Sequence, residues 1–591
     1  MIAEQRIQDA AGTGRPAVEV GNGGRMPRRS SYDFVVAGGG PNGLTIAAYL
    51  AKWGFSVCVL EARPEIGGGA ENVEPIPGYS VDPHACFFYG RGAPGLEQLE
   101  LGKYGFRTSP APGNFIAGPS GAAGGADRSM KMDSIDQFLE MGFDVDSAKL
   151  GLEFQQKLKA RLPEFLRSLY WTPPYDHRWG VAREEHPSVK IFKEVFPAWD
   201  DSMLDMSLYE WIELMGVPDP QKCGMMINAW GNGPHPCWKG MAIPAFGVGE
   251  LMSYVDGMPV TPVGGMHALA HAMARCAIAN GAKIFVNSPV SEVLVEDGQA
   301  YGVRVDDNSA LQEKTIRANL GVILNMHVKQ LPELVTRGSF TPDFIQKIDN
   351  LSLKGGSLFV TNFVVNEFPR FAAVPEIDGR PVTSTVLNAD TPRLLELMRD
   401  VHSFRTHPTD PDHFAGVWYI CHGAHDRSRV RGGNGNYVLT LNLQVPAPED
   451  HRDGPDAVNR AKDEIVATLK AQLREYAPNM TEDKFVATFV NTPRDSEIRN
   501  MAFVGGNWMG MRESEQEWGQ NKPLPELARY RTPVDGLYLC HQTSHPGGLV
   551  LMAVPYNLMH ILHEDYEAVS KTTPDWWYPS PWHITDKEGA R

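Results

Sequence analysis

The chain has 591 residues, of which 42% are hydrophobic and 21% are charged, and its formal net charge at pH 7 is −16. A chain of this length exceeds a single compact core, so we expect two domains. The negative charge disfavours binding to nucleic acid and general attraction to anionic lipid, and no stretch approaches the about 20 apolar residues that a bilayer span needs.

The first 30 residues are polar and rich in Gly, Arg and Pro. Since they contain no apolar core, they do not have the pattern of a secretory signal, and Glu4, Asp9 and Glu19 disfavour a mitochondrial presequence. We therefore expect a disordered tail and a cytoplasmic protein.

The first predicted strand, residues 32–37 (YDFVVA), ends in a glycine-rich turn that opens a helix. The turn has the pattern Gly38-x-Gly40-x-x-Gly43, and eighteen residues later a second strand ends in Glu61. This combination predicts a Rossmann unit, in which glycines allow the turn and the approach of a pyrophosphate, and the acid binds ribose hydroxyls. The residues predicted to bind the dinucleotide here are Gly38, Gly40, Pro41, Asn42, Gly43 and Glu61.

A second glycine cluster follows Glu61 directly. The sequence continues through Arg63 to residues 67–70 (GGGA). An NAD site needs no such cluster, whereas a flavoprotein chain must pass close to the ribityl group and the isoalloxazine ring. The pattern favours FAD over NAD, with an ordinary glycine loop as the alternative, and the predicted contacts are Arg63, Gly68, Gly69 and Ala70.

Near the C-terminus, a strand at residues 535–540 precedes the segment Ser544–Gly548 (SHPGG). An apolar helix is predicted from about residue 549 to 560. Its N-terminus would face an electron-rich group, such as the ring edge that becomes negative when a flavin is reduced. We therefore predict flavin contacts from Pro546, Gly547 and Gly548.

Together these motifs resemble the phytoene desaturase-related FAD-dependent oxidoreductases, a superfamily that includes carotenoid desaturases and amine oxidases. The segments 262–266 (PVGGM) and 491–495 (NTPRD) and the strand pair within 282–304 extend the resemblance over residues 32–564. The chain is most similar to the branch of pyridine nucleotide-disulfide oxidoreductase domain-containing protein 2. The resemblance implies that Val290 lies near the adenine half of FAD. Gly69 stands where many relatives carry an arginine, so carotenoid desaturases are a weak guide to the substrate.

The implied fold is α/β, with a discontinuous Rossmann-type FAD domain and an inserted α+β substrate domain, as in amine oxidases and phytoene desaturases. An amphipathic helix is predicted in the second insertion, where Val458, Ala461, Ile465, Leu469 and Leu473 recur at helical spacing. The expected boundaries are a tail at 1–30, an FAD domain at 31–110, 258–330 and 490–565, a substrate domain at 111–257 and 331–489, and an extended aromatic tail at 566–591.

Three histidines are candidates for contact with the flavin or substrate. His545 precedes Pro546 and the glycine pair, His84 follows the second glycine cluster, and His235 lies in an aromatic, glycine-rich loop. Each also has a purely structural interpretation, as a residue that shapes a turn or connects two helices. Met-rich residues 225–258 suit either an apolar substrate or a plain core.

The seven cysteines are scattered and never spaced Cys-x-x-Cys, which is typical of free thiols in a reducing compartment. A disulfide-based redox mechanism therefore has no support, and no metal-binding motif, nucleophile elbow or Walker loop is found.

The sequence predicts an FAD-dependent dehydrogenase or desaturase that transfers a hydride from a hydrophobic, isoprenoid or aromatic substrate to flavin N5. Electrons would then pass to oxygen, a quinone or a carrier protein. The alternatives are an amine oxidase that uses oxygen, a flavin-holding isomerase or scaffold without net redox turnover, and a hydrophobic-ligand binding protein on a membrane. Expected partners exclude nucleic acid, and peripheral membrane contact and oligomerisation stay open.

Overall fold

The computed structural model describes residues 18–20, 30–109, 113–117, 123–124, 134–197, 199–231, 235–253, 261–307, 309, 313–353, 357–374, 376–377, 380–403, 414–424, 426–431, 434–448, 451, 453–512, 518–549 and 552–577.

The first sheet is built around parallel strands in the order β8-β3-β2-β11-β18, and antiparallel strands extend it at both edges. Parallel strands covered on both faces have continuous apolar sequences, as in β3, where all four residues are buried. Phe34 and Val36 of β2 face one core, with α2 and α10, while Val35 and Ala37 face the other. The strands are β1 (Val18–Glu19), β2 (Ser31–Ala37), β3 (Val57–Leu60), β8 (Lys283–Val286), β9 (Val290–Glu296), β10 (Gln299–Val305), β11 (Thr315–Leu324) and β18 (Leu537–Leu539).

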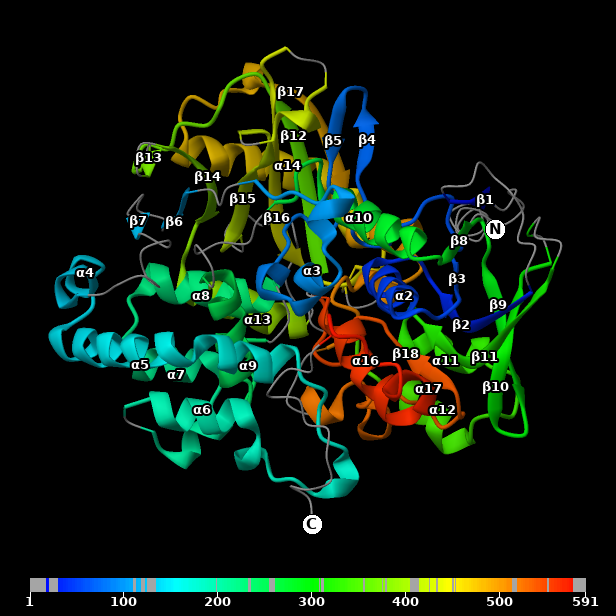
Figure 1. The fold of residues 1–591 in the computed structure, drawn as a ribbon. Helices are drawn as coiled ribbons and strands as arrows, with labels where there is room; N and C mark the ends of the chain where they lie inside the picture. Colours follow the sequence, from blue (N-terminus) through cyan, green and yellow to red (C-terminus); the bar gives the residue numbers. More distant parts are fainter. Residues whose placement is uncertain are drawn as a thin grey trace.

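The second sheet is mostly antiparallel and lies at the top of Figure 1, with the first sheet at the right. Its central pair, β12 and β16, is in register from Ser357 opposite Val445 to Val365 opposite Tyr437. Helix α14 covers it with the predicted apolar stripe, whose five members are all buried, so the amphipathic helix is confirmed. The strands are β6 (Gly113–Ala117), β7 (Ala123–Gly124), β12 (Ser357–Val365), β13 (Glu376–Ile377), β14 (Arg380–Leu387), β15 (Val417–Cys421), β16 (Tyr437–Val445) and β17 (Phe485–Asn491), and a separate hairpin is formed by β4 (Val73–Ile76) and β5 (Tyr79–Val81).

A group of helices from the first insertion lies at the lower left of Figure 1. Aromatic side chains hold it together, and the ring of Trp211 lies 4.9 Å from that of Phe246 and 5.3 Å from that of Phe192. The same core continues into α2 and α16, so these helices pack directly on the Rossmann domain. The α-helices are α2 (Pro41–Trp53), α3 (Pro94–Gln98), α4 (Ile135–Glu140), α5 (Val145–Tyr170), α6 (Pro187–Val195), α7 (Leu208–Leu214), α8 (Asp219–Gly231), α9 (Ala242–Ser253), α10 (Met266–Ala279), α11 (Leu331–Leu334), α12 (Pro342–Asp349), α13 (Thr391–Ser403), α14 (Ala457–Tyr476), α15 (Pro493–Arg499), α16 (Ala553–Asp565) and α17 (Glu567–Ser570).

Three segments bear on the expected boundaries. Residues 331–349 were assigned to the substrate domain, but α11 and α12 bury Leu331, Phe344 and Ile348 in the core of the first sheet. Within the expected tail at 1–30, Val18–Glu19 pairs with β8 as an edge strand, and residues 1–17 and 21–29 lie outside the described residues.

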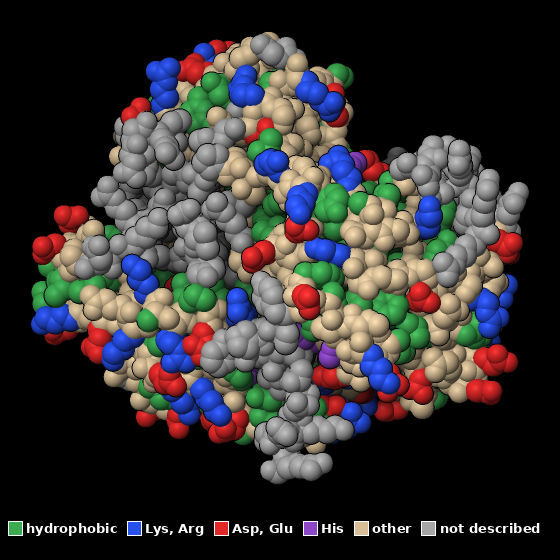
Figure 2. Space-filling view, in the orientation of Figure 1, with side chains coloured by type: hydrophobic (Ala, Val, Ile, Leu, Met, Phe, Trp, Pro, Cys, Tyr) green, Lys and Arg blue, Asp and Glu red, His purple; other side chains and the backbone are tan. Residues whose placement is uncertain are grey.

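In the expected C-terminal tail, Trp577 is buried and its ring lies 5.1 Å from that of Trp53, while residues 578–591 lie outside the described residues. On the face shown in Figure 2, acidic and basic side chains are interspersed rather than gathered by sign. None of the helices in the described ranges combines the length and the apolar character that a bilayer crossing requires.

Candidate functional site

The site begins where β2 turns into α2. Gly38 has φ +101°, and a Cβ there would lie 2.5 Å from the carbonyl oxygen of Asn325. A Cβ on Gly43 would lie 2.1 Å from the carbonyl oxygen of Gly38, so only glycine lets the first helical turn pack against the strand end. The N-cap, Gly40, offers no side chain to the free N–H groups of the first turn. These groups and the positive end of the helix dipole are therefore available to an anion.

Glu61 directly follows β3 and lines one pocket together with Gly38 and Gly40 of this turn. Its Oε2 accepts a hydrogen bond from the N–H of Gly39 at 2.6 Å, and its Oε1 accepts one from the N–H of Arg63 at 2.8 Å. Burial raises the pKa of Glu61, while these backbone donors act in the opposite direction. The carboxylate is thereby fixed in orientation beside the glycine turn, where the Rossmann fingerprint requires a ribose acceptor.

Arg63 and His84 meet on one buried carboxylate, Glu71. Arg63 donates to Glu71 Oε2, and His84 Nδ1 lies 3.4 Å from Oε1. Nε of Arg499, the last residue of α15, lies 3.7 Å from the same oxygen, Oε1 of Glu71. Burial acts to raise the pKa of Glu71, but the hydrogen bond from His84 and the charge of Arg63 outweigh it and lower the pKa to about 2. Glu71 therefore stays ionised and ties three segments together behind the pocket wall.

Gly69 lies under the ring of Phe503. A Cβ on Gly69 would lie 2.8 Å from Cζ of this phenylalanine, whose ring also lies 4.5 Å from that of His84. A side chain at position 69 would therefore require the Phe503 ring to move. Phe503 forms the pocket wall there.

Aromatic side chains from distant segments form part of the pocket lining. Phe87 and Tyr89 come from the loop after β5, Trp418 comes from β15 of the second sheet, and Trp508 follows α15. Among the described residues that line the pocket, Glu61 is the only carboxylate. The pocket lining therefore combines a charged, glycine-rich set with an aromatic set, and residues of both sheets contribute to it.

The C-terminal segment enters the pocket differently from the prediction. His541, Gln542, Gly548 and Leu549 line it, but Pro546 and Gly547 do not. Helix α16 begins only at Ala553, later than the predicted start near residue 549, so its N-terminus does not follow the glycine pair directly.

His545 lies outside the pocket lining. Its side chain is 2% exposed and packs 5.7 Å from the ring of Trp518. Its carbonyl oxygen accepts a hydrogen bond from Tyr530 at 2.7 Å, and burial holds the pKa of the imidazole well below its ordinary value. The interpretation as a residue that shapes the turn is the one that the structure supports.

The other two histidine candidates are also outside the pocket lining. His84 is buried behind the wall against Glu71, and burial lowers its pKa. His235 stacks on Trp238 with 4.5 Å between ring centroids and is 3% exposed, while residues 232–234 of the same loop lie outside the described residues.

Most of the predicted cofactor-binding residues do meet in one pocket. Those that line it are Gly38, Gly40, Pro41, Asn42, Glu61, Arg63, Gly68, Gly69, Ala70, Val290 and Gly548. Sequence reasoning missed a second set from distant segments, namely Asn325, Met326, Gln330, Trp418, Arg499, Phe503, Trp508, Met509, His541 and Gln542. Asn325 had a recognisable signal, because it directly follows β11, the strand parallel to β2 in the sheet.

Comparison with known proteins identifies relatives over almost the whole chain. Residues 36–98 match the family model described as NAD(P)-binding Rossmann-like domain. Pyridine nucleotide-disulfide oxidoreductase domain-containing protein 2 of Mus musculus is 26% identical over 92% of this chain and 95% of its own length. A limonene dehydrogenase subunit of Castellaniella defragrans is 23% identical over 91% of this chain and 96% of its own length.

Solved structures share the fold. An oxidoreductase from Methanosarcina mazei has a TM-score of 0.55 at 16% identity and covers 90% of this chain and 99% of its own. A putrescine oxidase solved with putrescine has a TM-score of 0.54 at 17% identity and covers 89% of this chain and 97% of its own. These matches agree with the resemblance found in the sequence, both to the branch of pyridine nucleotide-disulfide oxidoreductase domain-containing protein 2 and to the fold of the amine oxidases. This oxidoreductase keeps all seven cysteines, each within the described ranges, as free thiols.

Proposed function

We propose that this oxidoreductase binds FAD without a covalent bond and oxidises a hydrophobic substrate beside the aromatic part of the pocket lining. The observation that carries the proposal is the continuity of one pocket from Glu61 and the α2 N-terminus to Tyr89 and Trp418. A dinucleotide site that shares its pocket with aromatic side chains suits a cofactor with a reactive ring at one end. An NAD site alone would not require the second glycine cluster at Gly68 and Gly69.

The residues present fit FAD. The free N–H groups of α2 and the side chain of Arg63 suit the pyrophosphate, and Glu61 suits a ribose. Pro289 and Val290 supply an apolar contact on the side where the adenine half is expected. When bound, the flavin ring would accept a hydride equivalent at N5.

The aromatic residues would orient the substrate and exclude water. Phe87, Tyr89 and Trp418 are each less than 10% exposed, and besides Glu61 no carboxylate among the described lining residues is available to pair with a substrate cation. This favours an uncharged isoprenoid or aromatic substrate over an amine. The name of the Castellaniella relative, a limonene dehydrogenase subunit, supports the same substrate class.

The electron acceptor that we propose is oxygen, a quinone or a carrier protein, and we further propose a cytoplasmic location. The amine oxidase alternative rests on similarity of fold, because the solved amine oxidase structures are under 25% identical to this chain.

The test is anaerobic reduction of the purified holoprotein. Flavin absorption should bleach on addition of an uncharged isoprenoid or alkyl-aromatic substrate and return when a quinone or oxygen is added. Bleaching by amines alone would favour the amine oxidase. A bound flavin that no member of either class reduces would favour an isomerase or scaffold.

A further inference from the structure

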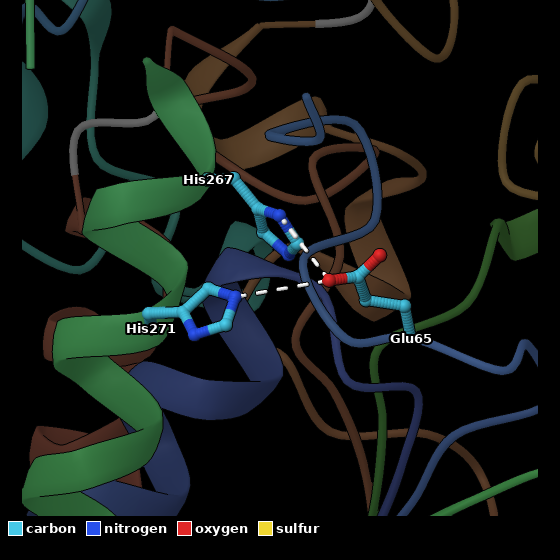
Figure 3. Close-up of side chains that lie close together, drawn as sticks. All are labelled: Glu65, His267 and His271. Carbon is cyan, nitrogen blue, oxygen red and sulfur yellow. Dashed lines mark ion pairs between the residues drawn. The ribbon is translucent and has the colours of Figure 1, made fainter. Parts of the chain in front are cut away.

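Outside the pocket, three metal-binding side chains converge beside the loop that follows β3. His267 and His271 lie four residues apart on α10, so helical geometry places them on one face. Glu65 reaches them from the loop between Glu61 and Gly69, and Figure 3 shows its carboxylate directed at both rings. The two segments are far apart in the sequence, which is why no metal motif was found there.

The distances suit a single ion. Oε1 of Glu65 lies 3.5 Å from Nδ1 of His267 and 3.8 Å from Nε2 of His271. One ligand atom from each of the three residues lies within 4.8 Å of the others. In a tetrahedral zinc site with bonds of about 2.0–2.1 Å, ligand atoms are roughly 3.3 Å apart. Only small rotations of the two half-exposed side chains, Glu65 and His271, would close the set.

The hydrogen bonding of His267 favours a cation at this point. Its Nε2 lies 2.8 Å from the carbonyl oxygen of Ile66, and a carbonyl can only accept, so this nitrogen carries the proton. In the neutral ring Nδ1 then presents a lone pair towards the Glu65 carboxylate. The Nδ1 lone pair of His267 and the carboxylate of Glu65 are both acceptors, so they repel each other unless a proton or a metal ion lies between them. A histidine whose other N–H donates to a backbone carbonyl is the usual arrangement around bound metals.

We propose that His267 Nδ1, His271 Nε2 and Glu65 Oε1 bind a Zn²⁺ ion whose remaining position is open to solvent. Two imidazoles and one carboxylate suit Zn²⁺ and neighbouring transition metals rather than Mg²⁺ or Ca²⁺, which prefer oxygen ligands. This site is independent of the proposed function. The sequence alone predicted no metal site.

The ion would hold the loop that carries Glu65 against α10. The contact is already close, since a Cβ on Gly67 would lie 2.9 Å from Cδ2 of His267. The same loop carries Arg63 and Gly68 into the pocket. Zn²⁺ binding is therefore expected to raise the thermal midpoint of the protein, because the assembled site binds the ion more tightly than the unfolded chain does.

The experiment is calorimetric titration of tag-free, chelator-treated protein with ZnCl₂, using wild type, His271→Ala, Glu65→Gln and a control. His177→Ala is the matched control, because the side chain of His177 is 39% exposed and that of His271 is 41% exposed. Wild type and the control should bind one Zn²⁺ per chain, and the two ligand variants should bind it at least about tenfold more weakly.

Equal Zn²⁺ affinity in wild type, H271A and E65Q would overturn the proposal, as would the absence of Zn²⁺ binding by wild type. MgCl₂ serves as the probe of selectivity, and Mg²⁺ that competes on equal terms with Zn²⁺ would also overturn it. The readout is heat and stoichiometry, so it does not depend on flavin binding or turnover.

Discussion

The guanidinium of Arg429 donates to the Asp82 carboxylate at 2.5 Å, and neither side chain has any exposure to solvent. Asp82 follows β5, while Arg429 lies between β15 and β16 of the second sheet. The other oxygen of Asp82 accepts the backbone N–H of Met266 at 3.1 Å, at the start of α10. The pair therefore joins the second sheet to the helix that the PVGGM segment opens.

Replacement of Arg429 by Met should destabilise the protein strongly, because the Asp82 carboxylate would be left buried without its partner. The expected cost is about 3–5 kcal/mol. Arg431→Met is the control, since the pair of Arg431 with Glu74 is exposed and such pairs contribute about 0–1 kcal/mol. Thermal midpoints of the two variants should differ clearly, and a similar midpoint for both would contradict the account of the buried pair.

Gly69→Ala should reduce flavin retention, because the added Cβ would displace the Phe503 ring, which lines the pocket. Overpacking of this kind costs about 1–3 kcal/mol. In the double variant Gly69→Ala/Phe503→Leu the smaller side chain should restore part of the loss, and this non-additivity is the diagnostic result. Flavin content per chain is the measurement, and simple additivity of the two changes would argue against the contact.

Glu61→Gln should weaken FAD binding with little change in fold. The amide keeps one oxygen acceptor for the backbone but loses the charge-assisted bonds to ribose, which are worth about 1.5–3 kcal/mol, or roughly ten- to a hundredfold in Kd. The comparison is FAD titration of apoprotein from E61Q and from the exposed-residue variant E140Q. Unchanged affinity in E61Q would place the ribose elsewhere.

Acid stability should depend on Glu71. Its pKa is about 2 in the folded chain against an ordinary value of 4.5, so the ionised carboxylate stabilises the fold above about pH 4.5. As the pH falls towards 2, this contribution, on the order of 3 kcal/mol, is lost. The thermal midpoint of wild type should therefore fall more steeply between pH 6 and pH 3 than that of Glu71→Gln. Parallel curves for the two proteins would show that Glu71 does not have this role.

Local patterns predicted local parts of the fold well. The turn at Gly38, the acid at Glu61 and the stripe of α14 each depend on residues close in sequence, where backbone geometry follows directly from residue type. The position of Val290 by the pocket came from the family resemblance and agrees with the lining.

The aromatic part of the pocket lining could not be predicted in the same way. Trp418 belongs to a strand whose register against β14 and β16 sets which side chains point at the pocket, and that register is a tertiary property. His545 precedes the glycine pair in the sequence but is not among the residues that line the pocket. The chain has left-handed residues at Leu549 and Met552, and α16 begins only at Ala553, after the predicted start.

The central claim is that separate segments of this chain build one FAD site, and the most direct measurement is the visible spectrum of the purified protein with quantification of released cofactor. The account predicts flavin absorption and about one FAD per chain, or stoichiometric uptake of added FAD by apoprotein. A colourless protein that does not take up FAD, or that binds only a nicotinamide dinucleotide, would contradict it.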